Sequence, residues 1–334
     1  MVSSTPWQDA LRHVITDPKE LLHLLELDPA LEQAARAASQ LFPLRVPRGF
    51  VARMKKGDIS DPLLRQVLPL GDELTIMPGY EQDPLQEKKV NPVPGLLHKY
   101  KGRVLITLTP ICAIHCRYCF RREFPYAENH PGKQGWEKLW DYIASDPTIE
   151  EVILSGGDPL SVNEKILFTF SEELAALSQI KTLRIHTRLP IVLPERITAD
   201  FIQWLGCLKQ KVVMVVHCNH AQEINEEVKQ GLRALHAAGV ILLNHTVLLK
   251  GVNDNADTLI ELNKALFAMN VLPYYLNLLD KVHGTHHFDV ALSQAKAIHQ
   301  TLVASLPGYL VPRLAREVPG AKAKVEGMYI IDAE

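Results

Sequence analysis

Apolar runs of strand length alternate with segments of helical pattern from about residue 100 onward. The runs are RVLITLT, EEVILSG, TLRIHT, KVVMVVH, VILLNHTVLL and PYYLNLL. Longer segments such as NEKILFTFSEELAALSQ and INEEVKQGLRALHAAG separate them and place apolar residues at helical spacing. Because strands separated by helix-length segments are typical of repeated βα units, the pattern predicts a parallel sheet, either doubly wound or closed into a partial barrel.

Polar residues follow nearly every predicted strand. The segments are SGGDP, HTRLP, HCNH, KGVND and DKVHG. The carboxyl ends of parallel strands meet at one edge of a sheet or one mouth of a barrel, where α/β folds bind their ligands. We therefore expect the functional site at these strand ends under either topology.

The N-terminal part of the chain has a different pattern. DPKELLHLLEL and ALEQAARAASQLF predict helices, and the stretch RVPRGFVARMKKGD follows them. We interpret its basic residues as a solvated helical face rather than a partner surface; they are Arg45, Arg48, Arg53, Lys55 and Lys56. We expect a helical region over residues 1–95, an α/β barrel over 96–306, and a C-terminal segment over 307–334 with a loop and one short strand.

Composition narrows the class of protein. Hydrophobic residues make up 47% and charged residues 22%, as in ordinary globular proteins. The 36 basic and 38 acidic residues give a net charge of −2, which disfavours nucleic-acid binding. The sequence has no apolar run of the roughly 20 residues that span a membrane, and its start lacks a signal-peptide pattern. We expect a cytoplasmic protein that acts on a small molecule.

Three of the five cysteines form one local motif. Cys112, Cys116 and Cys119 are spaced C-x3-C-x2-C directly after the first predicted strand. Three thiolates on one loop favour a [4Fe–4S] cluster with one open iron. Zinc is an alternative that would need His115 or a distant fourth ligand, and buried structural cysteines are another. Cys207 and Cys218 are interpreted as packed thiols.

This motif, with Tyr118 before its last cysteine, resembles that of the radical S-adenosylmethionine (SAM) superfamily. The resemblance implies a partial (β/α)6 barrel in which SAM chelates the open iron. Ser155, Gly156, Gly157 and Asp158 after the second predicted strand resemble the superfamily's glycine-rich SAM-binding element. Two glycines before Asp-Pro are by themselves an ordinary turn signal.

A narrower resemblance covers roughly residues 60–325. The segments DPLQE, VPGLLHKYKGRVL, CRYCFRREF, SGGDPL, HTRLPIVLPERIT, LLNHTVLLKGVNDN and PYYLNLLD are similar to lysine 2,3-aminomutases. RVPRGF, DPLLRQVLP and GYLVPRLARE resemble the short branch that makes (R)-β-lysine for modification of elongation factor P. The family also requires pyridoxal phosphate (PLP).

The resemblance implies roles for individual residues. Lys324 matches the lysine that binds PLP, with Lys322 as a rival, since Gly320 alone remains of the family's glycine run. Tyr100 and Arg103 match the residues beside the PLP ring and its phosphate.

Three further residues match the family's substrate-binding groups. Arg121 matches the arginine that holds the substrate α-carboxylate. Asp280 and Glu317 match the two carboxylates that receive the substrate's side-chain ammonium, although the second is Asp in the catabolic enzymes.

Histidines and one arginine cluster near predicted strand ends. His186, Arg188 and His245 are assigned to cofactor contacts, although His245 stands where the family has Gln. Asn277 likewise replaces an aromatic residue or His near PLP. Since the sequence contains no H-x-H or HExxH spacing, no second metal is predicted.

Together these features predict an isomerase that converts L-α-lysine to (R)-β-lysine. It would use a [4Fe–4S] cluster, SAM and PLP, take electrons from a low-potential donor, and serve the modification of elongation factor P. The alternatives are an aminomutase of another amino acid such as glutamate, and a catalytically inactive iron–sulfur interaction protein.

Overall fold

Nine strands form one sheet in the part of the chain that this computed structural model describes, residues 6–129 and 132–331. The strands are β1 (Leu96–Tyr100), β2 (Arg103–Thr109), β3 (Glu151–Gly156), β4 (Thr182–Thr187), β5 (Lys211–His217), β6 (Ile241–Val247), β7 (Val271–Asn277), β8 (Arg313–Arg316) and β9 (Val325–Glu326). Their order in the sheet is their order in the sequence. Each strand from β2 to β8 is parallel to the next one in this run, and β1 and β9 are antiparallel edge strands.

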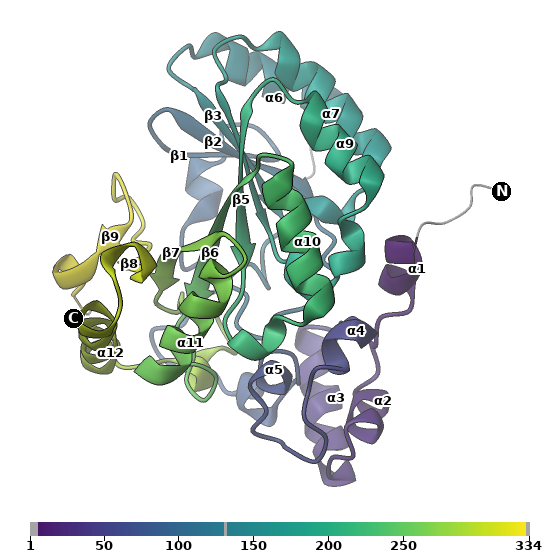
Figure 1. The fold of residues 1–334 in the computed structure, drawn as a ribbon, viewed down its shortest axis with the longest axis vertical. Helices are drawn as coiled ribbons and strands as arrows, with labels where there is room; N and C mark the ends of the chain where they lie inside the picture. The colour runs from purple at the N-terminus through teal and green to yellow at the C-terminus, as the bar shows by residue number, and fades with distance from the viewer. Residues whose placement is uncertain (1–5, 130–131, 332–334) are drawn as a thin grey trace.

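The strands β2 to β7 are the six predicted from the apolar runs, and the predicted α/β class is confirmed. A doubly wound sheet reverses its strand order at a switch point, whereas this order is sequential. Side chains from β2 to β7 also line one common cavity, which requires the sheet to curve around it. The fold is therefore the open, partial barrel and not the doubly wound alternative (Figure 1).

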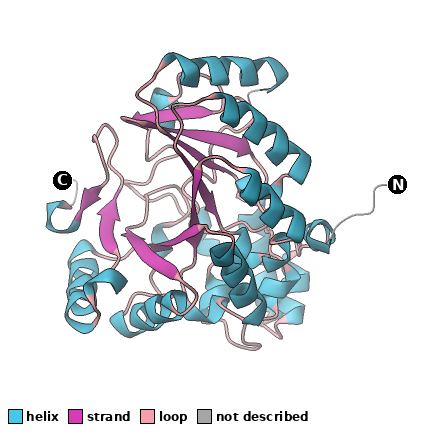
Figure 2. Cartoon of the chain, turned by 45° about the horizontal axis from the view of Figure 1, so that its top comes forward, coloured by secondary structure: helices cyan, strands magenta, loops and turns pink. Residues whose placement is uncertain are grey.

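Helices cover the outer face of the curved sheet (Figures 1 and 2). They are α6 (Gly132–Ser145), α7 (Glu164–Ala176), α8 (Leu189–Val192), α9 (Ala199–Cys207), α10 (Glu226–Ala237), α11 (Ala256–Phe267) and α12 (Leu292–Ser305). Four of them begin at a side-chain cap, because Asn163, Thr198, Asn225 and Asn255 each accept a hydrogen bond from a backbone N–H of the first turn. In these four places the cap fixes the residue at which the loop ends and the helix begins, which helps to hold the loop in place.

The N-terminal region is helical, as predicted. Its helices are α1 (Pro6–Arg12), α2 (Pro18–Leu24), α3 (Glu32–Leu41), α4 (Arg48–Val51) and α5 (Pro62–Arg65). One continuous hydrophobic core runs from Trp7 in this region, through the barrel, to Ile330. The N-terminal region therefore packs as part of the same core as the barrel.

Two strands were missed by the sequence pattern. β1 is only half buried along its length, and β8 has four residues, two of them arginines, so neither shows a long apolar run. The predicted short C-terminal strand is β9, which pairs with β8. Through this pairing, the described part of the C-terminal segment, residues 307–331, extends the barrel sheet instead of forming a separate unit.

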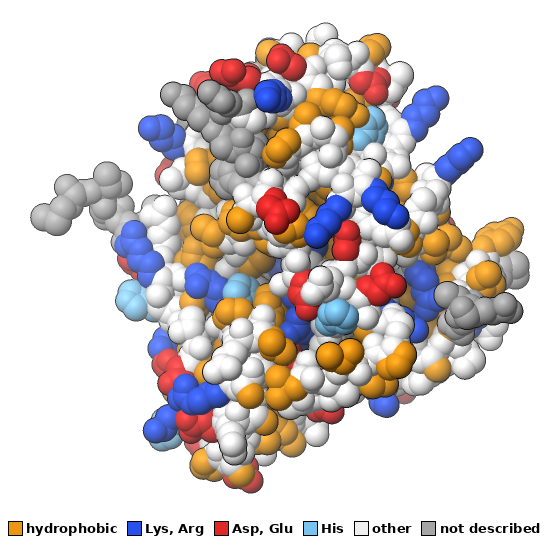
Figure 3. Space-filling view, turned by 180° about the vertical axis from the view of Figure 1, so that it is seen from behind, with side chains coloured by type: hydrophobic (Ala, Val, Ile, Leu, Met, Phe, Trp, Pro, Cys, Tyr) orange, Lys and Arg blue, Asp and Glu red, His pale blue; other side chains and the backbone are white. Residues whose placement is uncertain are grey.

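The surface is mixed in charge. Figure 3 shows basic and acidic side chains interspersed over one face of the molecule, in keeping with the net charge of −2. In the described residues, no helix combines the length and the apolar character needed to cross a membrane.

Candidate active site

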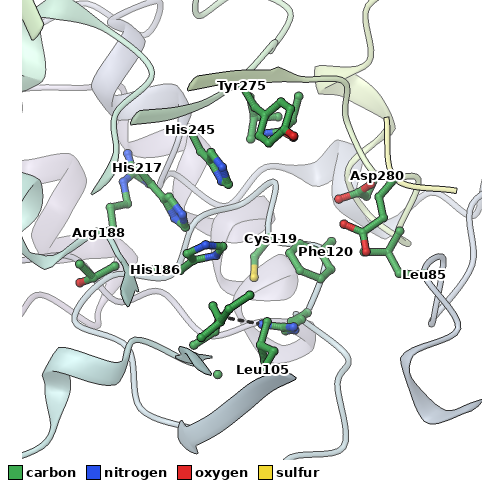
Figure 4. A pocket seen from close by; sticks show the side chains of 18 of the residues that line it. Leu85, Leu105, Cys119, Phe120, His186, Arg188, His217, His245, Tyr275 and Asp280 are labelled. Carbon is green, nitrogen blue, oxygen red and sulfur yellow. Dashed lines mark hydrogen bonds between the residues drawn. The ribbon is translucent and has the colours of Figure 1, made fainter. Parts of the chain in front are cut away.

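One cavity of about 630 Å³ lies at the carboxyl ends of the barrel strands, as the polar strand ends predicted. It is lined by residues from β1 to β7, from the loop after β2, and from the segment before β9 (Figure 4). Every residue assigned to the site from the sequence lines this cavity; these are Tyr100, Arg103, Cys112, Cys116, Cys119, Arg121, Ser155, Gly156, Gly157, Asp158, His186, Arg188, His245, Asp280, Glu317 and Lys324.

The three motif cysteines lie on the loop after β2 and are all free thiols. Burial raises the pKa of Cys112 and raises that of Cys119 to about 11, because a thiolate loses its hydration there. A metal ion bound beside a buried cysteine lowers the pKa of the thiol and so favours the thiolate. Three neighbouring thiols on one buried loop are suited to an iron–sulfur cluster, and this set fits that group.

The cysteine loop is held in place by the N-terminal region. Arg45 donates from Nε to the carbonyl of Cys112 at 2.7 Å and from Nη2 to the carbonyl of Leu11 at 3.0 Å. Arg53 donates from Nη1 to the carbonyls of Ile191 and Glu223 at 2.7 and 2.6 Å. The interpretation of the whole basic stretch as a solvated face is therefore wrong for these two arginines, because each guanidinium donates hydrogen bonds to backbone carbonyls distant in sequence.

Gly156 and Gly157 shape the same loop from the end of β3. A Cβ on Gly157 would lie 2.5 Å from the carbonyl oxygen of Ile111, and one on Gly156, at a φ of +119°, would lie 2.7 Å from that of Thr109. Such distances are impossible for a side chain. The glycines therefore let β3 approach the segment that leads into Cys112.

Asp158 lines the cavity, but its carboxylate is bound by protein groups. Its carboxylate accepts hydrogen bonds from Thr187 Oγ1 and the backbone N–H of Arg188, both at 2.7 Å, and from the backbone N–H of Leu160 at 3.1 Å. Burial raises its pKa to about 6. It joins the ends of β3 and β4 and leaves few lone pairs for a ligand.

Arg188 donates from Nη1 to the sulfur of Cys116 at 2.7 Å. Its Nη2 donates to Gln66 Oε1 at 2.7 Å and to Glu223 Oε2 at 3.0 Å. Glu223 is fully buried and also accepts from the backbone N–H of Asn219. Gln66 and Glu223 were missed by sequence reasoning, because nothing in their local sequence marks a buried carboxylate and amide.

Arg121 forms a buried two-pronged ion pair with Glu87. Its Nε and Nη2 each donate to a carboxylate oxygen of Glu87 at 2.8 Å, and its Nη1 donates to Ser155 Oγ at 3.0 Å. Burial alone would raise the pKa of Glu87, but Arg121 and Lys99 lower it overall. Glu87 was not assigned from the sequence, although it is the last residue of the DPLQE segment that carried the resemblance.

Lys324 lies on the turn before β9 with its amine turned into the cavity. The Nζ atom is 3.2 Å from a carboxylate oxygen of Glu317 and 3.2 Å from Asn277 Oδ1. Lys99 Nζ approaches the other oxygen of Glu317 at 2.7 Å and Glu87 at 3.3 Å. The rival Lys322 is exposed and does not line the cavity.

The two assigned carboxylates differ in charge state. Burial alone would raise the pKa of Glu317, but Lys324 and Lys99 lower it to about 2. Burial raises the pKa of Asp280 to about 7, although Lys324 opposes this shift. Glu317 is therefore ionised and already paired with two lysines, whereas Asp280 has no ion-pair partner among the described residues.

Arg103 and Tyr100 lie side by side at the hairpin between β1 and β2. The Arg103 guanidinium stacks 4.9 Å above the Tyr100 ring. Among the described residues no carboxylate forms an ion pair with Arg103, so its donors are available to an anion such as a phosphate.

Comparisons with known proteins show the family of this chain. Residues 101–190, which include the three motif cysteines, match a family model described as a 4Fe-4S single cluster domain. An L-lysine 2,3-aminomutase from Escherichia coli (strain K12) is 48% identical over 323 residues, covering 96% of this chain and 94% of that protein. The Haemophilus influenzae protein of the same name is 46% identical and covers 95% and 94%. That of Clostridium subterminale is 33% identical and covers 99% and 80%.

Solved structures add little. A radical SAM methyltransferase from Sphaerobacter thermophilus matches 66% of this chain and 68% of that chain, with 15% identity and a TM-score of 0.45. The partial barrel and the three-cysteine loop define an iron–sulfur protein of the radical SAM class. On the identities above, the chain belongs to the lysine 2,3-aminomutase family.

Proposed function

We propose that this chain is a lysine 2,3-aminomutase that converts L-α-lysine to β-lysine. The observation that carries the proposal is that a single cavity is lined by the three cysteines, by Lys324, and by the Asp280–Glu317 pair. An ammonium at the end of a substrate side chain matches Asp280, which has no ion-pair partner among the described residues, whereas Glu317 is already paired with Lys99 and Lys324. The relatives named as L-lysine 2,3-aminomutases support this choice of substrate.

Each cofactor of the family has fitting residues in the cavity. Cys112, Cys116 and Cys119 would hold the [4Fe–4S] cluster, and Ser155, Gly156 and Gly157 would adjoin SAM. Lys324 would bind PLP, with Arg103 at its phosphate and Tyr100 at its ring. When bound, the cluster and SAM supply the radical that starts the reaction, and PLP carries the amino group that migrates.

The residues of the chain orient the substrate. Arg121 binds Glu87 through Nε and Nη2 and Ser155 through one of its two Nη1 N–H groups, so we place the substrate α-carboxylate at the second Nη1 N–H. The side-chain ammonium then lies at Asp280, where its positive charge favours the ionised form of that carboxylate. Glu317 remains ionised throughout, held by Lys99.

The test is an anaerobic assay of the reconstituted protein with SAM, PLP, dithionite and either L-lysine or L-glutamate. We expect β-lysine from lysine and a preference over glutamate of at least about a hundredfold in kcat/KM, since a few kcal/mol separate an attractive from a repulsive charge contact. Equal turnover of glutamate would contradict the lysine assignment. Absence of turnover with an intact cluster would favour the interaction-protein alternative.

The finer assignment is that the product is (R)-β-lysine, used in the cytoplasm to modify elongation factor P, with electrons from a low-potential donor. The segments RVPRGF and DPLLRQVLP support this branch of the family. Chiral chromatography of the product tests the stereochemistry. The mass of elongation factor P from cells with and without this protein tests the pathway, and an unchanged mass would contradict it.

A further inference from the structure

Arg188 follows directly after β4, and its guanidinium is enclosed by protein groups. The residue is 4% exposed, and its Cζ atom lies 5.6 Å from the centre of the Phe50 ring and 5.7 Å from that of Tyr118. Of its donors, Nη1 is directed at the sulfur of Cys116 at 2.7 Å. A cation in such an enclosed place acts strongly on its neighbours, because little water is present to screen it.

Gln66 fixes both partners of the contact between Arg188 and Cys116. Its side-chain Oε1 accepts from Arg188 Nη2 at 2.7 Å. Its backbone carbonyl accepts at 2.9 Å from the N–H of Arg117, the residue directly after Cys116. Gln66 is fully buried, and its Nε2 donates to a carboxylate oxygen of Glu223 at 3.2 Å, which sets the orientation of the amide. One residue of the N-terminal region therefore holds the donor and the acceptor in register.

Glu223 supplies the negative charge that a buried guanidinium requires. Its Oε2 accepts from Arg188 Nη2 at 3.0 Å, and its Oε1 accepts from the backbone N–H groups of Asn219 and His220 at 2.9 and 3.1 Å. The carboxylate is thus fixed by the backbone on one side and by Arg188 on the other. The ion pair is neutral as a whole, and its positive end is the end that contacts Cys116.

This arrangement bears on the electron that the cluster must accept. Reduction adds one negative charge, which is shared between the irons and the sulfurs that surround them. A charged donor on a thiolate sulfur therefore stabilises the reduced state more than the oxidised state, and hydrogen bonds to the sulfurs are one of the factors that set the potential of such clusters.

We propose that Arg188 is a positioning residue that acts through Cys116 to raise the reduction potential of the cluster, and that Gln66 holds it in the geometry this requires. The higher potential would ease reduction by an external donor. The proposal rests on a cluster held by Cys112, Cys116 and Cys119, and it does not depend on lysine being the substrate.

The test measures the cluster itself, in the anaerobically reconstituted full-length protein without lysine or PLP. Iron per chain is determined first, and the midpoint potential then follows from a dithionite titration monitored by electron paramagnetic resonance. In Arg188→Gln we expect one-electron reduction to become more than about tenfold less favourable, a fall of about 59 mV or more. Arg188→Lys keeps the charge but loses the planar guanidinium, so its potential should lie between those of Arg188→Gln and the parent.

The matched control is Arg196→Lys. Arg196 is also a fully buried arginine, but it donates to the carbonyl of Leu160 and to Glu164 and does not line the cavity. This variant should lose stability and keep the potential of the parent. A role of Arg188 in structure alone would likewise lower the melting temperature and the iron content without moving the potential of the cluster that is bound.

A double-mutant cycle tests the role of Gln66. Gln66→Met removes the acceptor while keeping the backbone carbonyl, so it should lower the potential less than Arg188→Gln does, and it should add nothing in the Arg188→Gln background. An unchanged potential in Arg188→Gln, or additive effects of the two substitutions, would overturn the proposal. If Arg188→Gln retains no cluster, potentials equal to that of the parent in Arg188→Lys and Gln66→Met would overturn it instead.

Discussion

Glu317 is shared by two lysines, and this supports the proposal that Lys324 rather than Lys322 binds PLP. Its carboxylate holds the Lys324 amine inside the cavity at 3.2 Å, while Lys99 takes the other oxygen. Lys322, two residues away, is exposed. The local sequence contains both lysines in nearly the same surroundings, so the distinction comes from the fold.

We expect Lys324→Ala to lose the PLP adduct that borohydride reduction traps, with its cluster unaffected, since PLP needs an amine within the cavity. Absorbance of the reduced protein and peptide mapping provide the measurement. Lys322→Ala is the matched control and should keep the adduct. PLP mapped to Lys322 would show the assignment to be wrong.

Asp280 should control lysine turnover in a pH-dependent way. Its pKa of about 7 in the free protein means that the carboxylate is increasingly ionised as pH rises through that value. We expect kcat/KM for lysine to rise over that range. Asp280→Asn should lower it at least about a hundredfold, the cost of leaving a buried ammonium unpaired, and should flatten this limb of the profile. SAM and PLP binding should be nearly unchanged.

Glu317→Gln is the comparison for Asp280→Asn. It should weaken lysine turnover less, while the pH limb assigned to Asp280 persists. Full activity of Asp280→Asn on lysine would remove the basis for the carboxylate pair.

At the scale of elements, the loop after β2 depends on what surrounds it. The C-x3-C-x2-C spacing brings the thiols near one another, but Arg45 and the glycine turn after β3 set the path of the loop. The motif is thus local, and its support comes from residues far apart in the chain.

We expect alanine at Cys112, Cys116 or Cys119 to abolish the iron–sulfur absorbance or to leave it labile, because three ligands offer no redundancy. Iron content and visible absorbance after anaerobic reconstitution give the measurement. The controls are Cys207→Ala, at an exposed position on α9, and Cys218→Ala, and both should keep the cluster. A stable, fully occupied cluster in Cys116→Ala would refute the radical SAM assignment.

Gly157→Ala should displace the cysteine loop. The added Cβ would meet backbone atoms at 2.5 to 2.7 Å, and backbone cannot rotate away as a side chain can. We expect a lower melting temperature together with poor iron retention. In Gly206→Ala, on α9, the new Cβ meets no atom within 4 Å, so helix propensity predicts a gain of up to about 1 kcal/mol. Equal behaviour of the two variants would contradict the close-approach argument.

At the scale of the whole molecule, the N-terminal region and the barrel share one core. Arg196, in the loop before α9, is fully buried between the rings of Trp7 and Phe201, at 4.5 and 4.6 Å. This contact joins α1 to the outer helices of the barrel. The same region also supplies Arg45 and Arg53 to the site loops, so its folding is coupled to the active site.

We therefore expect urea unfolding of the apoprotein to be one transition, with circular dichroism and tryptophan fluorescence coinciding. Trp7→Ala should lower the free energy of unfolding for that whole transition by about 3–5 kcal/mol, the usual cost of removing a buried large aromatic side chain. Tyr329→Ala is the control, since Tyr329 is 78% exposed. An early separate transition in Trp7→Ala would show that the N-terminal region is an independent unit.

The spacing of apolar residues and the cysteine motif were enough to predict part of the fold and of the site from the sequence. The six parallel strands β2 to β7 could be predicted because buried strands are continuous apolar runs and helices repeat every 3.6 residues. The cysteine motif could be found because its ligands lie on one loop. Lys324, Asp280 and Arg121 were located by their resemblance to family segments, and all line the cavity.

Only the tertiary structure decided which distant groups meet. Examples are Glu87 with Arg121, Glu223 with Arg188, Arg45 with Cys112, and His217 with His245, which come from different loops or strands. Each depends on strand order and register, which no local pattern encodes. The strands β1 and β8 belong here too, since they are held by pairing to a neighbour rather than by apolar runs of their own. The sequence thus determines which chemical groups the protein carries. Their charge states and their partners depend on burial in the folded barrel.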